Sequence, residues 1–165
     1  MPDMRRIASF LLSFPLLFSL LFSSPAAFGA ITEADAKYAQ SAGKATQEFS
    51  TAIGDWGDTY QSAPDKVNSP EYRNWMKKAQ AADKAVKVTL TNFSKIKVSA
   101  GYKGSDTSLR KFIKAYNNAI DLYSPAIKKN DRKLVKKAND ALMAATTLFT
   151  NWGNEFAKDT SRLAQ

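Results

Sequence analysis

The stretch SPEYRNWMKKAQAADKAVKVTLTNF, residues 69–93, contains both the start and the apolar face of a long helix. Ser69 is a favoured N-cap, Pro70 suits the first helical position, and Glu71 is favourable near a helix N-terminus. Apolar and small residues then recur three or four positions apart, as on one face of a helix. They are Tyr72, Trp75, Met76, Ala79, Ala82, Val86, Leu90 and Phe93. The pattern predicts an amphipathic helix from residue 70 to about Lys97.

Two segments on either side of this stretch show the same spacing. The segment before it covers residues 32–62, with an apolar face of Tyr38, Ala42, Ala45, Phe49, Ala52, Trp56 and Tyr60. The segment after it has the face Leu109, Phe112, Ile113, Tyr116, Ile120, Tyr123 and Ile127. We expect Ser105 or Asp106 to cap this third helix. Pro125 should kink the helix or end it early, because the proline ring removes a backbone donor.

The last segment follows the short connection KKND, residues 128–131. Asn130 can adopt the left-handed conformation that ends a helix, and Asp131 can cap the next one. The apolar face of this fourth helix is Leu134, Ala138, Ala141, Ala145, Leu148, Trp152 and Phe156. Short connections favour antiparallel neighbours. We therefore predict an all-α fold, an antiparallel up-down-up-down four-helix bundle formed by residues 30–165.

The first 29 residues are predicted to be a signal peptide. Arg5 and Arg6 precede an apolar stretch at residues 7–22, and the small residues of SSPAAFGA follow. This order is typical of a secretory signal peptide, and cleavage is expected after Gly29. The apolar stretch is shorter than the roughly 20 residues that a membrane span needs. The protein is therefore expected to be secreted or periplasmic, with an uncleaved N-terminal anchor as the alternative.

Trp-Gly pairs occur in two similar contexts, DWGDTY at residues 55–60 and NWGNEF at residues 151–156. A shift of 96 positions superimposes the apolar face of the first helix on that of the fourth. The similarity fits two helices that meet the same packing demand, with small Ala residues beside large aromatic ones. Trp56 and Trp152 are then core residues at opposite ends of the bundle. The alternative is a ligand pocket between the aromatic rings.

The composition removes most common catalytic chemistry. The chain has no His and no Cys, so the usual general base, nucleophilic thiol and transition-metal ligands are missing. No pair of Asp or Glu residues occupies core positions suited to acid-base catalysis. We therefore expect no catalytic residues, no metal and no cofactor, and we predict that the protein is not an enzyme.

The charge is concentrated in the middle of the chain. Residues 66–137 contain 18 Lys and Arg against 5 Asp and Glu, a net charge of +13, whereas residues 30–65 carry −4. In the predicted bundle the start of the second helix lies at the same end as the connection to the fourth. The candidate anion-binding or partner-binding residues there are Arg73, Lys77, Lys78, Lys128, Lys129, Arg132, Lys133, Lys136 and Lys137. Asp55, Asp58 and Asp65 are expected to neutralise part of this end.

Three kinds of acidic partner fit an exported basic surface: an acidic protein, an anionic envelope polymer or lipid head groups. Predicted export disfavours nucleic acid, and membrane contact would be at most peripheral. The leading hypothesis is an exported, non-catalytic binding or accessory protein. The alternative is a small-ligand carrier or sensor module with an aromatic-lined cavity between its helices. A basic surface that only maintains solubility remains open as well.

Overall fold

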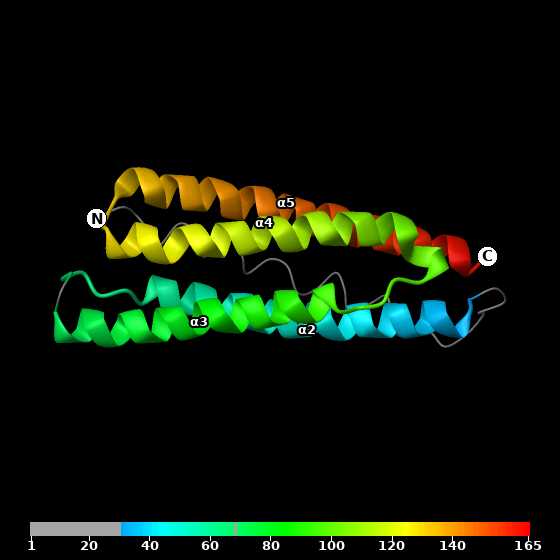
Figure 1. Ribbon diagram of the computed structural model, residues 1–165, viewed down its shortest axis with the longest axis horizontal. Helices are drawn as coiled ribbons and strands as arrows, with labels where there is room; N and C mark the ends of the chain where they lie inside the picture. Colours follow the sequence, from blue (N-terminus) through cyan, green and yellow to red (C-terminus); the bar gives the residue numbers. More distant parts are fainter. Residues whose placement is uncertain (1–30, 68) are drawn as a thin grey trace.

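The computed structural model describes residues 31–67 and 69–165 as four long helices and one short helical turn (Figure 1). The elements are α2 (Glu33–Gln61), α3 (Pro70–Ser94), the 3-10 turn η1 (Ala100–Tyr102), α4 (Lys103–Lys128) and α5 (Arg132–Leu163). These two ranges contain no β-strand, so the predicted all-α class with four helices is confirmed. The predicted signal peptide, residues 1–29, lies outside the described residues.

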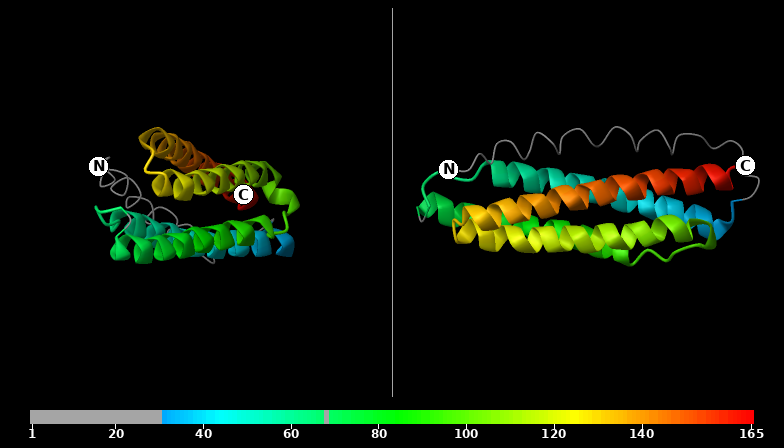
Figure 2. Two further views of the ribbon diagram at one scale, coloured as in Figure 1. Left: turned by 60° about the vertical axis from the view of Figure 1, so that its left-hand side comes forward. Right: turned by 90° about the horizontal axis from the view of Figure 1, so that it is seen from above.

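Hydrogen bonds join the beginning of each later helix to the end of the helix before it. The indole of Trp75, early in α3, donates to the carbonyl of Thr59, late in α2, at 2.7 Å. The hydroxyl of Tyr123, late in α4, donates to the side chain of Asn139, early in α5. Figures 1 and 2 show α2 beside α3 and α4 beside α5, as two pairs stacked on each other.

Several predicted helix caps are confirmed. The Ser69 hydroxyl accepts a hydrogen bond from the backbone N–H of Tyr72 at 3.1 Å, and Pro70 occupies the first turn of α3. Asn130 has a left-handed backbone with φ of 49°. The carboxylate of Asp131 accepts hydrogen bonds from the first backbone N–H groups of α5. Local sequence therefore determines where α3 begins and where α4 gives way to α5.

The predicted cap of α4 is wrong. Neither Ser105 nor Asp106 caps the helix, because η1 runs directly into α4 and both residues lie inside its first turn. The missing cap comes from another helix: the carboxylate of Asp159 in α5 accepts a hydrogen bond from the Ser105 N–H at 3.2 Å. Asp106 instead forms an ion pair with Arg110 at 2.8 Å.

Two predicted helix ends also differ from the structure. Pro125 does not end α4 at its own position, and the helix continues for three more residues to Lys128. α3 ends at Ser94 rather than near Lys97. The guanidinium of Arg110 donates to the carbonyl of Ser94 at 2.9 Å and to that of Ile96 at 3.1 Å. A side chain from α4 thus satisfies carbonyls that an additional turn of α3 would have used.

Aromatic rings from all four helices fill the core. The ring of Phe49 in α2 lies 5.3 Å from that of Phe112 in α4 and 5.4 Å from that of Phe149 in α5. Trp56 is 1% exposed and Trp152 is 0% exposed, and the two side chains contact different sets of rings. The prediction that both tryptophans are core residues is confirmed.

The buried face of α5 is turned relative to the predicted one. Ala138, Ala145, Trp152 and Phe156 are buried as expected. Leu134, Ala141 and Leu148 are only partly buried, and the predicted face did not include the buried residues Val135, Leu142 and Phe149. The apolar stripe of α5 is wide, and contact with α4 selects which part of it faces inward.

Candidate functional site

The ends of three helices bring the predicted basic residues together at one end of the molecule. The Tyr72 hydroxyl, in the first turn of α3, donates to the carbonyl of Ile127, in the last turn of α4, at 3.2 Å. The short connection after Lys128 places the start of α5 next to the end of α4 (Figure 1). We define the basic end as the cations on these three helix ends: Arg73, Lys77, Lys78, Lys128, Lys129, Arg132, Lys133, Lys136 and Lys137.

All nine side chains of the basic end are exposed. Lys136 forms an ion pair with Asp140 at 2.6 Å, one helical turn further along α5. Among the residues that the structure describes, no acidic side chain lies within ion-pair distance of Lys129, Lys133 or Lys137. Their positive charges are therefore available to an anion from solution.

The start of α5 adds to this positive potential. Its first turn contains Arg132 and Lys133 and no acidic residue. The backbone N–H groups of a helix N-terminus carry partial positive charge, so two cations there raise the local potential further. Asp131 offsets part of it, because its carboxylate caps the N–H groups of Lys133 and Leu134 at 2.8 Å and 3.2 Å. The remaining field favours anions at this end.

Three acidic residues of α2 and its connection to α3 are the predicted neutralising charges of this end. Asp55 and Asp58 are exposed on the last part of α2, and Asp65 is exposed in the connection to α3. Within residues 31–67 and 69–165, none of the three forms an ion pair with the basic end. Any neutralisation by these carboxylates therefore acts without ion pairs, over the range of about 8 Å that screening leaves at physiological ionic strength.

A buried carboxylate that the sequence analysis missed lies between α2, α3 and α4. Asp83 in α3 is 9% exposed and accepts three side-chain hydrogen bonds. The donors are the indole of Trp56 at 2.8 Å, the hydroxyl of Tyr60 at 3.0 Å and the hydroxyl of Ser124 at 2.6 Å. Burial, followed by the nearby Asp83 carboxylate, raises the pKa of Tyr60 well above its ordinary value. The three donors make Asp83 a structural carboxylate that ties three helices together.

The aromatic residues that were considered as a pocket lining contact one another. The ring of Trp56 lies 4.4 Å from that of Tyr60 and 4.7 Å from that of Tyr123. At the other end, the ring of Tyr102 stacks on both Tyr38 and Phe156. Such contacts are typical of packed protein cores. They support the packing interpretation of the repeated Trp-Gly pairs.

Comparisons of the chain with protein-family models, curated proteins and solved structures found no match. The part of the chain that the structure describes has no group of three His, Cys, Asp or Glu side chains that could hold a metal ion. Among the same residues, no helix is long and apolar enough to cross a membrane. The exposed basic end is the candidate site, because it gathers cations from three helix ends.

Proposed function

We propose that the protein is an exported, non-catalytic binding or accessory protein that contacts an acidic partner or anionic envelope surface through its basic end. In this proposal residues 1–29 are removed as a signal peptide. Residues 30–165 then form an antiparallel up-down-up-down four-helix bundle. The observation that carries the proposal is the gathering of nine exposed cations at the meeting point of α3, α4 and α5.

The arrangement suits binding of an anion by charge rather than by chemical conversion. Lysine side chains on helix ends can adjust to anions of different shape, because each is a flexible chain with a compact charge. Two carboxylates beside them are already engaged, because Asp131 caps α5 and Asp140 pairs with Lys136. A site of this kind attracts and holds an anion, and it offers no acid or base to act on it.

The basic end can be tested with a small anion. Tripolyphosphate is titrated into the mature protein while backbone amide resonances are recorded by nuclear magnetic resonance. We expect shifts at the start of α3, the end of α4 and the start of α5, and affinity that falls steeply as salt is added. The triple variant K129E/K133E/K137E should lose this binding. Lys136 is left unchanged because Lys136→Glu would oppose Asp140.

The control variant is K84E/K95E/K114E, which has the same change in net charge away from the basic end. Both variants should melt within a few degrees of the wild type, because exposed charges contribute little to folding. The control variant should bind tripolyphosphate nearly as well as the wild type. Equal losses from the two variants would show that net charge alone matters. No salt-sensitive binding would refute an anion site.

A further inference from the structure

A line of lysines continues from the basic end along α3. Lys77, Lys84 and Lys95 are exposed and are spaced seven and eleven residues apart, so they follow one side of the helix. Lys87 lies close to this line and forms an ion pair with Asp121 of α4. Because Lys87 borders α4 and is three residues after Lys84, the line of lysines lies next to that side, on the outer surface of α3.

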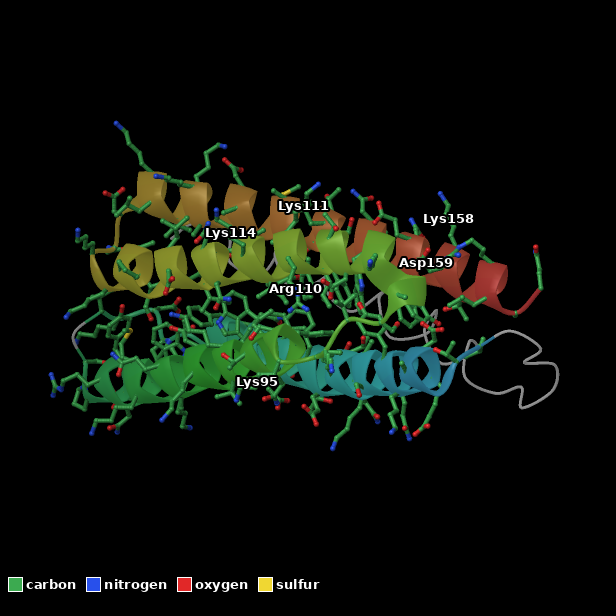
Figure 3. All side chains as sticks on the ribbon, turned by 45° about the vertical axis from the view of Figure 1, so that its right-hand side comes forward. Lys95, Arg110, Lys111, Lys114, Lys158 and Asp159 are labelled. Carbon is green, nitrogen blue, oxygen red and sulfur yellow. The ribbon has the colours of Figure 1, made fainter. Side chains whose placement is uncertain are left out.

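Helix α4 contributes a matching line. Lys114, Asp121 and Lys128 are spaced seven residues apart, so Lys114 and Lys128 share the side of α4 that carries Asp121. We call the surface formed by Lys77, Lys84, Lys95, Lys114 and Lys128 the α3–α4 face. Figure 1 shows α3 and α4 together at the front of the molecule, and Figure 3 labels Lys95 and Lys114 on them.

The acidic residues near this face are already paired. Asp121 pairs with Lys87, and Asp106 pairs with Arg110, which also holds the carbonyl groups at the end of α3. In the part of the chain that the structure describes, none of the five lysines of the α3–α4 face has an ion-pair partner. The face therefore presents one sign of charge along most of the bundle.

The length of the α3–α4 face limits which anionic partners can contact all of its lysines. Lys77 and Lys95 are 18 residues apart, which corresponds to roughly 27 Å along a helix at about 1.5 Å per residue. This is about three times the screening length of roughly 8 Å at physiological ionic strength. A small anion on the basic end would not sense Lys95. The far lysines can contribute only to a partner that extends along the molecule.

We propose that the partner is a linear anionic polymer that starts at the basic end and continues along the α3–α4 face. This inference rests on the proposed function of the basic end and adds the chemical class of its partner. A flexible chain can follow charges from the end of the bundle onto its side, whereas a flat lipid surface contacts one plane. The described large apolar side chains that are clearly exposed are Val88, Val98 and Met143, which include no aromatic residue for membrane insertion.

Long-chain polyphosphate and tripolyphosphate share one chemistry and differ in length. They therefore separate the anion site at the basic end from the extended site along the α3–α4 face. Affinities for both are measured by titration calorimetry on the mature wild-type protein and on the variants K129E/K133E/K137E and K84E/K95E/K114E. A third variant, K37E/K111E/K158E, has the same change in net charge outside both surfaces. Figure 3 shows Lys111 and Lys158 on the side of the molecule that carries α5. Circular dichroism checks that each variant is folded.

The wild type should bind long-chain polyphosphate at least about tenfold more tightly than tripolyphosphate, a gain of about 1.4 kcal/mol. The variant K84E/K95E/K114E should lose this gain and keep its affinity for tripolyphosphate. The variant K129E/K133E/K137E should lose both, and K37E/K111E/K158E should keep both. A long chain that binds no more tightly than a short one would overturn the linear partner while leaving the basic end in place.

Two further outcomes complete the test. If the wild type does not bind tripolyphosphate, the proposed anion site at the basic end fails, and the linear partner fails with it. Binding to vesicles of mixed phosphatidylglycerol and phosphatidylcholine tests whether the partner is an anionic lipid surface. If these vesicles bind with the dependence on Lys84, Lys95 and Lys114 expected here, and polyphosphate does not, the partner is a lipid surface and the inference is wrong.

Discussion

Replacing Asp83 by Leu removes a carboxylate that accepts three side-chain hydrogen bonds between α2, α3 and α4. The indole of Trp56 and the hydroxyl of Tyr60 belong to buried residues, so both donors lose a partner away from bulk water. Ser124 is half-buried, and its hydroxyl can turn to another acceptor. Each unsatisfied buried donor costs about 1–3 kcal/mol, and the added apolar side chain offsets part of this. We expect a net loss of roughly 2–3 kcal/mol in the free energy of unfolding.

The loss is measured by urea unfolding of the protein, followed by circular dichroism. A domain of this size has a total stability of about 5–15 kcal/mol, so the expected change is large. The matched control is Asp140→Leu, which removes an exposed carboxylate from an ion pair on α5. The control should change the stability by less than about 0.5 kcal/mol, because exposed ion pairs contribute little.

A double-mutant cycle with Tyr60→Phe tests the proposed cause. In the wild-type background Tyr60→Phe removes a hydroxyl that is bonded to Asp83, and it should be destabilising. In the Asp83→Leu background the same hydroxyl already lacks its partner, so its removal should cost less. We expect a coupling of about 1–2 kcal/mol between the two positions. Additive losses, or an Asp83→Leu variant as stable as the wild type, would refute the role assigned to the carboxylate.

Two further predictions concern the end of the molecule opposite the basic end. A Cβ atom at Gly101 would lie 2.6 Å from the carboxylate oxygen of Asp35 and 2.7 Å from Leu163, so Gly101→Ala should lower the free energy of unfolding by about 1–3 kcal/mol in urea titrations. The control is Gly54→Ala, where nothing lies within 4 Å of the added Cβ atom, and it should raise the free energy of unfolding by about 0.5–1 kcal/mol. If Gly101→Ala were the more stable of the two variants, the close approach at Gly101 would be contradicted. Hydrogen bonds from the Thr32 hydroxyl and the Gly101 N–H hold the pKa of Asp35 below its usual 3.8. The ionised Asp35 carboxylate therefore stabilises the fold fully above pH 3.8, and this stabilisation is lost as the pH falls through the lower pKa that Asp35 has in the folded protein. Unfolding curves at decreasing pH should show a smaller acid loss for Asp35→Asn than for the wild type.

The sequence predicts well those features that neighbouring residues determine. Ser69 and Pro70 start a helix by themselves, and Asn130 with Asp131 ends one helix and starts the next. In each case the groups that satisfy the backbone lie within a few residues. Regular spacing likewise placed both Trp56 and Trp152 in the core.

The features that were missed depend on contacts between distant residues. The cap of α4 comes from Asp159, more than fifty positions away along the chain, so Ser105 and Asp106 were plausible but incorrect candidates. Asp83 lies four residues after Ala79 and three before Val86, which is the spacing of the buried face. That spacing was a usable signal for a buried carboxylate. Its donors come from α2 and α4, so sequence spacing alone could not identify them.

Helices α2 and α3 carry net charges of opposite sign. Helix α2 contains five acidic and two basic residues, whereas α3 contains five basic and two acidic ones. This separation gives the bundle an electric dipole across its width. Near a polyanion the molecule would rotate before contact, so that α3 leads and the carboxylates of α2 point away. Such steering acts mainly on the association rate constant. Added salt should therefore slow capture far more than it hastens release.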